Sequence, residues 1–232
     1  MGVFAGPDIS ESGLVLALDA GNSKSYPGSG TTWTDLSGNG NTGTLVNGVG
    51  YNSSNGGSLT FDGVNDNVSI LYNASLKPTT AITMEAFCYI QNNSTIWTSL
   101  IQYPFNSAFH TDPYFEWGIY LNMSSRFLHT RIDGEPASSP SNVWNFDVWT
   151  YVAITFENQS VKYYVNGSSV GSSSITKTSI TYNADNPVYI GKNASGSEPF
   201  EGRLGNIKVY NRALTESEIQ QNFIATRSRF SI

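Results

Sequence analysis

The chain has 232 residues and carries 12 Lys and Arg against 18 Asp and Glu, which gives a formal net charge of −6. This length is enough for one large domain, and an acidic chain without a basic stripe is a poor nucleic-acid binder. The 13% aromatic content excludes a disordered chain. No apolar run approaches the roughly 20 residues that cross a bilayer. The single cysteine, Cys88, cannot form an internal disulfide.

Short runs rich in β-branched and aromatic residues, separated by Gly, Asn, Ser and Pro, predict strands along most of the chain. We predict eleven strands, at 13–19, 58–62, 67–71, 82–90, 99–103, 115–121, 126–132, 149–157, 161–166, 187–192 and 202–211. In 149–157, the residues alternate as in a strand with one buried face, and Asn166-Gly167 supplies the two-residue turn of a hairpin. No helical pattern separates these runs, so the sequence predicts an all-β fold in which sheet packs on sheet.

Two further segments have a predicted local structure. The run DLSGNGNTG at 35–43 lacks the Lys-Ser/Thr ending of a phosphate loop and predicts a turn-rich surface excursion. Near the end of the chain, Thr215 and Glu218 form the pattern of a capping box at the start of a helix. Ile219 and Phe223 lie four residues apart on one face of that helix, so we expect it to dock on the sandwich.

Four sequence blocks carry a resemblance to a known family: GLVLALDAGNSKSYPGSGTTWTDLSGNGNTGTLVNG, GGSLTFDGVNDNVSI, WTYVAITF with VKYYVNG, and FEGRLGNIKVYNRALTESEI. Together they resemble the laminin-G-like, concanavalin-A-like lectin/glucanase family. The resemblance implies a two-sheet antiparallel jelly-roll β-sandwich with one short C-terminal helix, and binding at a concave face or at rim loops. We place this domain at 13–225, with an N-terminal arm at 1–12 and a C-terminal tail at 226–232 outside the core.

Because the resembling family includes glucanases, hydrolysis is the first chemistry to consider. Members of the superfamily typically place their carboxylates at alternate positions of one strand, as an E-x-D-x-E run, and this chain has no such run. Glu85, Glu116 and Glu157 are each isolated from other carboxylates in the sequence. We therefore expect the protein not to be an enzyme.

Calcium is the cofactor to consider. The run FDGVNDNV places Asp62, Asn65 and Asp66 close together around Gly63, and hard oxygen atoms on a bend suit Ca²⁺. In the resembling family, calcium commonly sits at a sandwich edge and is held by such side chains. The alternative is that Asp62 and Asp66 cap a tight turn through their own hydrogen bonds to the backbone.

Sugar recognition needs aromatic faces for the apolar side of the ring and polar groups for its hydroxyls. Aromatic and polar residues crowd the predicted rim loop in 103–117, and two further tryptophans lie in loop-like sequence. The candidate carbohydrate-binding residues are Trp97, Tyr103, Asn106, Asp112, Tyr114 and Trp144. The alternative role for such aromatic residues is in the core or in a contact between subunits.

The first block is also similar to blocks in structural proteins of tailed bacteriophages and in bacterial surface proteins. The first twelve residues lack the basic and apolar regions of a secretory signal. We therefore expect a non-enzymatic virion structural protein that is assembled in the host cytoplasm and exposed on the virion surface as a decoration or fibre-type module. Its expected partners are capsid or tail proteins, host-surface glycans and further copies of itself. We expect the two arms to attach it to the capsid or tail proteins. We expect it to bind neither nucleic acid nor a membrane. The alternative is a bacterial surface or secreted carbohydrate-binding adhesion module.

Overall fold

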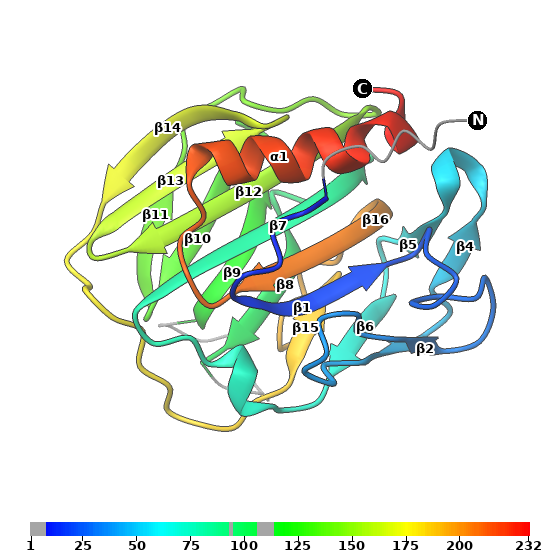
Figure 1. Ribbon diagram of the computed structural model, residues 1–232, viewed down its shortest axis with the longest axis horizontal. Helices are drawn as coiled ribbons and strands as arrows, with labels where there is room; N and C mark the ends of the chain where they lie inside the picture. The colour runs from blue at the N-terminus through cyan, green and yellow to red at the C-terminus, as the bar shows by residue number, and fades with distance from the viewer. Residues whose placement is uncertain (1–7, 93–94, 106–113) are drawn as a thin grey trace.

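The computed structural model describes residues 8–92, 95–105 and 114–232. Within these residues the chain forms two eight-stranded antiparallel sheets that pack face to face, which confirms the predicted all-β sandwich (Figure 1). Sheet A has the spatial order β14 (Ser168–Ser174), β13 (Ser160–Val165), β12 (Trp149–Glu157), β7 (Ala81–Ile90), β16 (Glu201–Tyr210), β5 (Ser58–Asp62) and β4 (Gly50–Asn52), and β1 (Leu14–Asp19) pairs with β16. Sheet B has the order β11 (Glu135–Ser138), β10 (Phe127–Ile132), β9 (Phe115–Asn122), β8 (Trp97–Pro104), β15 (Val188–Ile190), β6 (Asn67–Ile70), β3 (Gly43–Val46) and β2 (Thr32–Trp33).

The eleven predicted strands correspond to strands of the structure, with ends that differ by a few residues. Five strands were not predicted, namely β2, β3, β4, β11 and β14, and four of these lie at the outer edges of the two sheets. Edge strands such as β14, with the sequence SSVGSSS, are held by backbone pairing on one side and bury few apolar side chains. Asn166 and Gly167 join β13 to β14 with φ of 49° and 76°, as the predicted hairpin turn requires.

Sheet A has a core on each side. On β12, Val152, Ile154 and Phe156 face sheet B, in the main core of the sandwich. Tyr151 and Ala153 point the other way and belong to a second apolar cluster, which lies beneath α1 (Glu216–Arg227). The strand is therefore buried on both faces, whereas its sequence predicted one buried face, because α1 covers the face that would otherwise meet solvent.

The C-terminal helix α1 begins with the predicted capping box. Thr215 Oγ1 accepts a hydrogen bond from the backbone N–H of Glu218 at 3.3 Å, and the Glu218 carboxylate accepts one from the Thr215 N–H at 2.9 Å. Ile219 and Phe223 are buried against sheet A, which confirms the predicted docking. In the described part of the chain, no helix is long and apolar enough to cross a membrane. Short 3₁₀ helices occur at η1 (Ser54–Gly56), η2 (Ala74–Leu76) and η3 (Ser228–Phe230).

A buried polar group also fastens α1 to the sheet. Lys208 Nζ lies 2.7 Å from Glu85 Oε1, while the Tyr151 hydroxyl and Asn222 Nδ2 donate hydrogen bonds to Glu85 Oε2 at 2.6 and 2.9 Å. A charge taken out of water needs such partners, because an unpaired buried carboxylate is strongly destabilising. The position of α1 is therefore fixed by directional polar contacts as well as by apolar burial.

The C-terminal residues pack against the sandwich instead of lying outside the core, so the expected tail at 226–232 is corrected. The Phe230 ring is buried with its centroid 4.5 Å from that of Phe87 and 4.4 Å from that of Trp149. Arg229 donates to both carboxylate oxygens of Asp19, at 2.7 and 2.8 Å. An aromatic side chain and a bidentate ion pair tie this segment to the fold.

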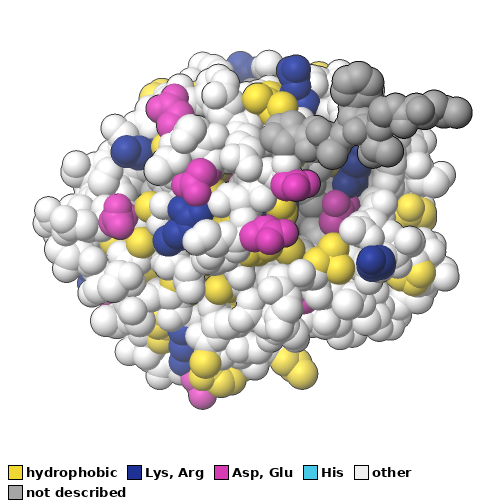
Figure 2. All heavy atoms as spheres, in the orientation of Figure 1, with side chains coloured by type: hydrophobic (Ala, Val, Ile, Leu, Met, Phe, Trp, Pro, Cys, Tyr) yellow, Lys and Arg dark blue, Asp and Glu magenta, His cyan; other side chains and the backbone are white. Residues whose placement is uncertain are grey.

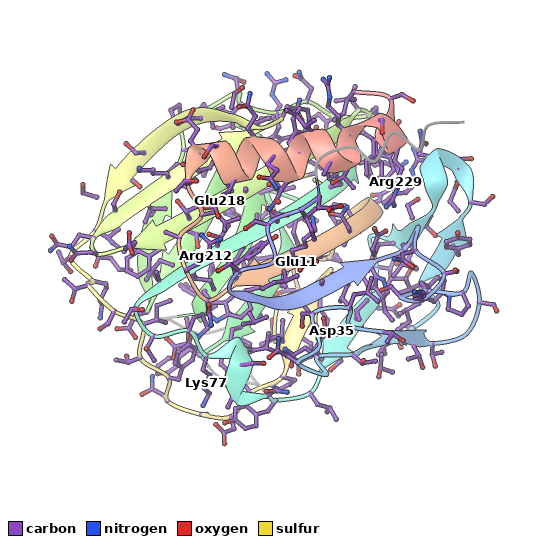
Figure 3. All side chains as sticks on the ribbon, viewed as in Figure 1. Glu11, Asp35, Lys77, Arg212, Glu218 and Arg229 are labelled. Carbon is purple, nitrogen blue, oxygen red and sulfur yellow. The ribbon has the colours of Figure 1, made fainter. Side chains whose placement is uncertain are left out.

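Residues 8–12 also lie against the described domain, beside α1. The Ser10 N–H donates to Asn222 Oδ1 at 2.7 Å, and Arg212 donates to the carbonyl oxygen of Ser12 at 2.8 Å. Arg212 also pairs with Glu218, and both side chains are labelled near the start of α1 in Figure 3. Figure 2 shows acidic and basic side chains interspersed on this face, without a large patch of one sign.

Candidate functional site

A cavity of about 480 Å³ opens on the outer face of sheet B, on the side of the sandwich opposite α1. Strands β8, β9 and β10 contribute most of its walls, and the residue before β9 and the connection between β15 and β16 contribute the rest. The described residues that line it are Trp97, Tyr114, Phe115, Tyr120, His129, Arg131 and Glu198.

Strand register brings the central residues of this cavity together. On β9, Ile119 and Leu121 face the core, so Tyr120 between them faces outward. Tyr120 pairs with His129 on β10, which places these two side chains next to each other on the same face. The Trp97 ring reaches across from β8, with its centroid 5.1 Å from that of His129.

A bulge adds a further aromatic ring to the cavity. The pairing of β8 with β9 shifts after Trp117, so that Pro104 pairs with Phe115 and Glu116 is left without a partner. An extra residue of this kind changes which side chain faces outward. The Phe115 ring consequently stacks on Tyr120, with a centroid distance of 4.5 Å and an interplanar angle of 9°.

Charged side chains flank the aromatic rings. The Arg131 guanidinium lies over the Tyr114 ring at 4.5 Å, and Glu198 accepts a hydrogen bond from Asn193 Nδ2 at 3.0 Å. Burial, together with the nearby charge of Arg131, lowers the pKa of His129 to about 4. His129 therefore meets a ligand as a neutral imidazole at neutral pH.

This arrangement suits a small polar molecule that contains a ring. The volume lies within the range of about 300–1,000 Å³ that is usual for small-molecule sites. The partly exposed rings of Trp97 and Tyr114 offer apolar stacking surface, while Arg131, Glu198 and His129 offer hydrogen-bonding groups at the edges. The cavity thus combines the two features that a sugar ring requires.

Two of the predicted carbohydrate-binding residues, Trp97 and Tyr114, line the cavity. They come from different elements, since Trp97 begins β8 and Tyr114 immediately precedes β9. Asn106 and Asp112 lie outside the described residues.

Tyr103 and Trp144 lie elsewhere. Both side chains are buried in the core between the two sheets, not on the outer face of sheet B where the cavity opens. The Tyr103 hydroxyl donates to the carbonyl oxygen of Ala184 at 2.9 Å, which holds the connection before β15 against the sheet. We therefore correct the sequence-based assignment of these two aromatic residues, because their rings are not available to a ligand.

Sequence reasoning missed the other lining residues. Tyr120, His129 and Arg131 alternate with core residues in predicted strands, so their common outward face was a usable signal. Phe115 reaches the cavity through the bulge, and Glu198 comes from a connection between strands. Neither of these two positions follows from strand alternation.

The loop proposed for calcium forms a self-capped turn. Asp62 Oδ1 accepts hydrogen bonds from the N–H groups of Val64 and Asn65 at 2.8 and 3.3 Å, and Asp66 Oδ2 accepts one from the Asp62 N–H at 3.1 Å. Asp66 Oδ1 is buried and has no hydrogen-bond partner, and burial raises the pKa of this carboxyl. Among the described residues, no three His, Cys, Asp or Glu side chains converge as a metal site. The loop thus retains one oxygen suited to a cation, and calcium binding stays a prediction.

The carboxylates considered for hydrolysis do not line the cavity. Glu85 is paired with Lys208 beneath α1, and Glu116 is 1% exposed in the bulge of β9. Among the described residues, Glu198 is the carboxylate that the cavity presents.

Comparison with known proteins identifies a matching family and solved structures with a similar fold. The family described as the concanavalin A-like lectin/glucanases superfamily, of laminin G type, matches residues 61–220. Domain 4 of AbnA, a GH43 extracellular arabinanase from Geobacillus stearothermophilus whose structure contains arabinotriose, has a TM-score of 0.69 and 17% identity, covering 93% of this chain and 100% of that one. Trypanosoma rangeli sialidase in complex with 2,3-difluorosialic acid has the same TM-score and identity, and the match covers 98% of this chain but 35% of the sialidase.

A sequence relative is much longer than this chain. Adhesion G-protein coupled receptor V1 of Danio rerio is 29% identical over 103 residues, which is 44% of this chain and 2% of the receptor. The solved structures, at 17% identity, establish similarity of fold alone. Since the family match extends over more than half of the sequence, the chain belongs to the laminin G-type family of the concanavalin A-like lectin/glucanase superfamily.

Proposed function

We propose that the protein is a non-catalytic carbohydrate-binding module that holds a sugar ring in the cavity on sheet B. The observation that carries the proposal is the convergence of Trp97, Tyr120 and His129 from three neighbouring strands, beside the charged groups of Arg131 and Glu198. In this arrangement, the indole of Trp97 stacks on the apolar face of the sugar while the charged groups form hydrogen bonds with the sugar hydroxyls.

The family supports this proposal at the level of fold. Its description includes lectins, and domain 4 of the arabinanase, which covers 93% of this chain, was solved with arabinotriose. That ligand belongs to the arabinanase domain, and we take from it the chemical class to be screened first. Arabino-oligosaccharides therefore join gluco-oligosaccharides and bacterial surface glycans in the test.

For the biological setting, we propose a surface-exposed decoration or fibre-type module of a tailed-phage virion that touches host glycans and is attached to capsid or tail proteins. The similarity of the first sequence block to phage structural proteins supports this setting. A bacterial surface or secreted adhesion module is the alternative. Neighbouring capsid and tail genes favour the first setting, and neighbouring secretion genes favour the second.

The test is calorimetric titration of the protein with this oligosaccharide panel. Trp97→Ala should weaken the best ligand at least about tenfold, as expected for the loss of a central aromatic anchor. Tyr72→Ala is the matched control, since Tyr72 is an aromatic residue that is 42% exposed and does not line the cavity. Equal affinity in the native protein and Trp97→Ala, or no binding across the panel, would refute the proposal. Prolonged incubation should release no new reducing ends, and steady release would show that the module is catalytic.

A further inference from the structure

A partly buried lysine without an acidic partner lies close to the cavity. Lys192 Nζ sits 4.9 Å above the ring of Tyr189, and its burial lowers the pKa of the ammonium group. Five other Lys and Arg side chains form ion pairs between described residues, and Lys192 is in none of them. Although the protein has a net charge of −6, no acidic side chain among the described residues pairs with this ammonium group.

Strand order connects this lysine to the cavity. Val188 and Ile190 belong to the core, so Tyr189 between them faces outward from sheet B. Tyr189 pairs with Gln102 on β8, and Gln102 Oε1 accepts a hydrogen bond from the hydroxyl of Tyr120 in the cavity wall. Across β8, Tyr189 lies level with Gly118, and Tyr120 is two residues further along β9. With neighbouring strands about 4.8 Å apart and about 3.4 Å between residues along a strand, Tyr189 and Tyr120 are about 12 Å apart.

The polar groups between the two positions suit a chain of sugars. Gln102 Nε2 is buried and has no hydrogen-bond partner, so the boundary between the positions contains an unused donor. Glu198, which lines the cavity, is hydrogen bonded to Asn193, the residue that follows Lys192. A negative group on a ligand is therefore disfavoured beside Glu198 and favoured beside Lys192.

We propose that the sugar site continues across β8 to a second subsite, formed by Lys192 and Tyr189, which binds the anionic group of an acidic oligosaccharide. The neutral ring of that ligand occupies the cavity, and the carboxylate or sulfate of a neighbouring sugar pairs with the Lys192 ammonium. This inference rests on the proposed function, because it assigns a ligand class to the same face.

The test compares three trisaccharide probes that differ at one sugar: a neutral one, one with a uronic acid and one with a sulfate ester. The native protein should bind at least one acidic probe about tenfold more tightly than the neutral probe, as expected for a charge-assisted hydrogen bond, and added salt should reduce this preference. The two acidic probes distinguish a carboxylate ligand from a sulfate ligand.

Lys192→Met removes the charge and keeps an apolar stem against Tyr189. It should abolish the preference for the acidic probe and leave the affinity for the neutral probe unchanged, while Lys192→Arg should retain the preference. Lys162→Met is the matched control, because it removes an exposed lysine from β13 on the other sheet.

Equal affinity of the native protein for all three probes, or a preference that survives in Lys192→Met, would overturn the subsite. Trp97→Ala tests the proposed function separately, because it should weaken the neutral and acidic probes alike. If the native protein bound no probe, both the subsite and the proposed function would be refuted.

Discussion

The buried carboxyl of Glu116 predicts an unusual dependence of stability on pH. Glu116 is 1% exposed, Oε1 accepts a hydrogen bond from Asn183 Nδ2 at 3.2 Å, and Oε2 has no hydrogen-bond partner. Burial, and after it the negative charge of Asp133, raises the pKa of Glu116 from 4.5 to about 7. The folded protein therefore holds a proton on this carboxyl at pH values where the unfolded chain has released it.

The sign and size of the effect follow from this difference. Between pH 4.5 and about 7 the folded state binds more protons than the unfolded state, so the free energy of unfolding falls as the pH rises through this window. A pKa difference of this size contributes about 3 kcal/mol to the free energy of unfolding at low pH, and this contribution is fully lost above the pKa of the folded state. Glu116→Gln carries no ionisable proton. It should be more stable than the native protein by less than about 1 kcal/mol at pH 5 and by about 3 kcal/mol at pH 8.

Urea unfolding of the two proteins at pH 5, 6, 7 and 8 measures this difference directly. Glu157→Gln is the control, because it removes an exposed glutamate at the end of β12 and should leave the pH profile unchanged. Asp133 and Glu135 have lowered pKa values, so their contributions to stability are lost only at more acidic pH. A gap between native and Glu116→Gln that does not widen from pH 5 to pH 8 would refute the account of the buried carboxyl.

Three further outcomes are expected. Phe230→Ala should lower the free energy of unfolding in urea by about 3–5 kcal/mol, because it empties the aromatic contact with Phe87, and an unchanged midpoint would mean that the tail is not part of the fold. The Cys88 thiol is buried, and burial raises its pKa, so a thiol reagent should label it slowly in the native state and rapidly in denaturant; rapid native labelling would contradict the register of β7. If the loop binds calcium only when folded, excess Ca²⁺ should raise the melting temperature. A Ca²⁺ concentration of a hundred times the dissociation constant should stabilise the folded state by about 2.7 kcal/mol, and Asp66→Ala should abolish this gain. A melting curve indifferent to calcium and to chelator would leave the loop as a capped turn.

The elements that the sequence predicted well are those with local signals. The turn at Asn166-Gly167 is determined by the need for positive φ at two successive residues, and the start of α1 by a reciprocal hydrogen bond between Thr215 and Glu218. Both signals span a few residues, so they can be read without knowledge of the rest of the chain. The edge strands escaped prediction because backbone pairing forms them with little apolar burial.

The candidate site depends on contacts between residues far apart in the sequence. Trp97 and His129 meet because β8 and β10 flank β9 in one register, and Phe115 joins them through a bulge. Tyr103 has the same sequence character as Tyr114, yet it is buried, and its hydroxyl bonds to Ala184. Composition alone cannot distinguish an aromatic residue that lines a cavity from one that supports a loop.

The positions of the two chain ends determine how the module would present its ligand site. Gln221 on α1 donates a hydrogen bond to the carbonyl oxygen of Asp8, and Ile232 packs on the cluster beneath the same helix. Both ends of the described domain therefore lie on the sheet A side, as Figure 1 shows, while the cavity opens from sheet B. An anchor joined to either end would stand behind the sandwich and leave the cavity pointing outward. Many copies anchored side by side would then engage a glycan-coated surface together, so that a weak individual affinity could still give firm attachment.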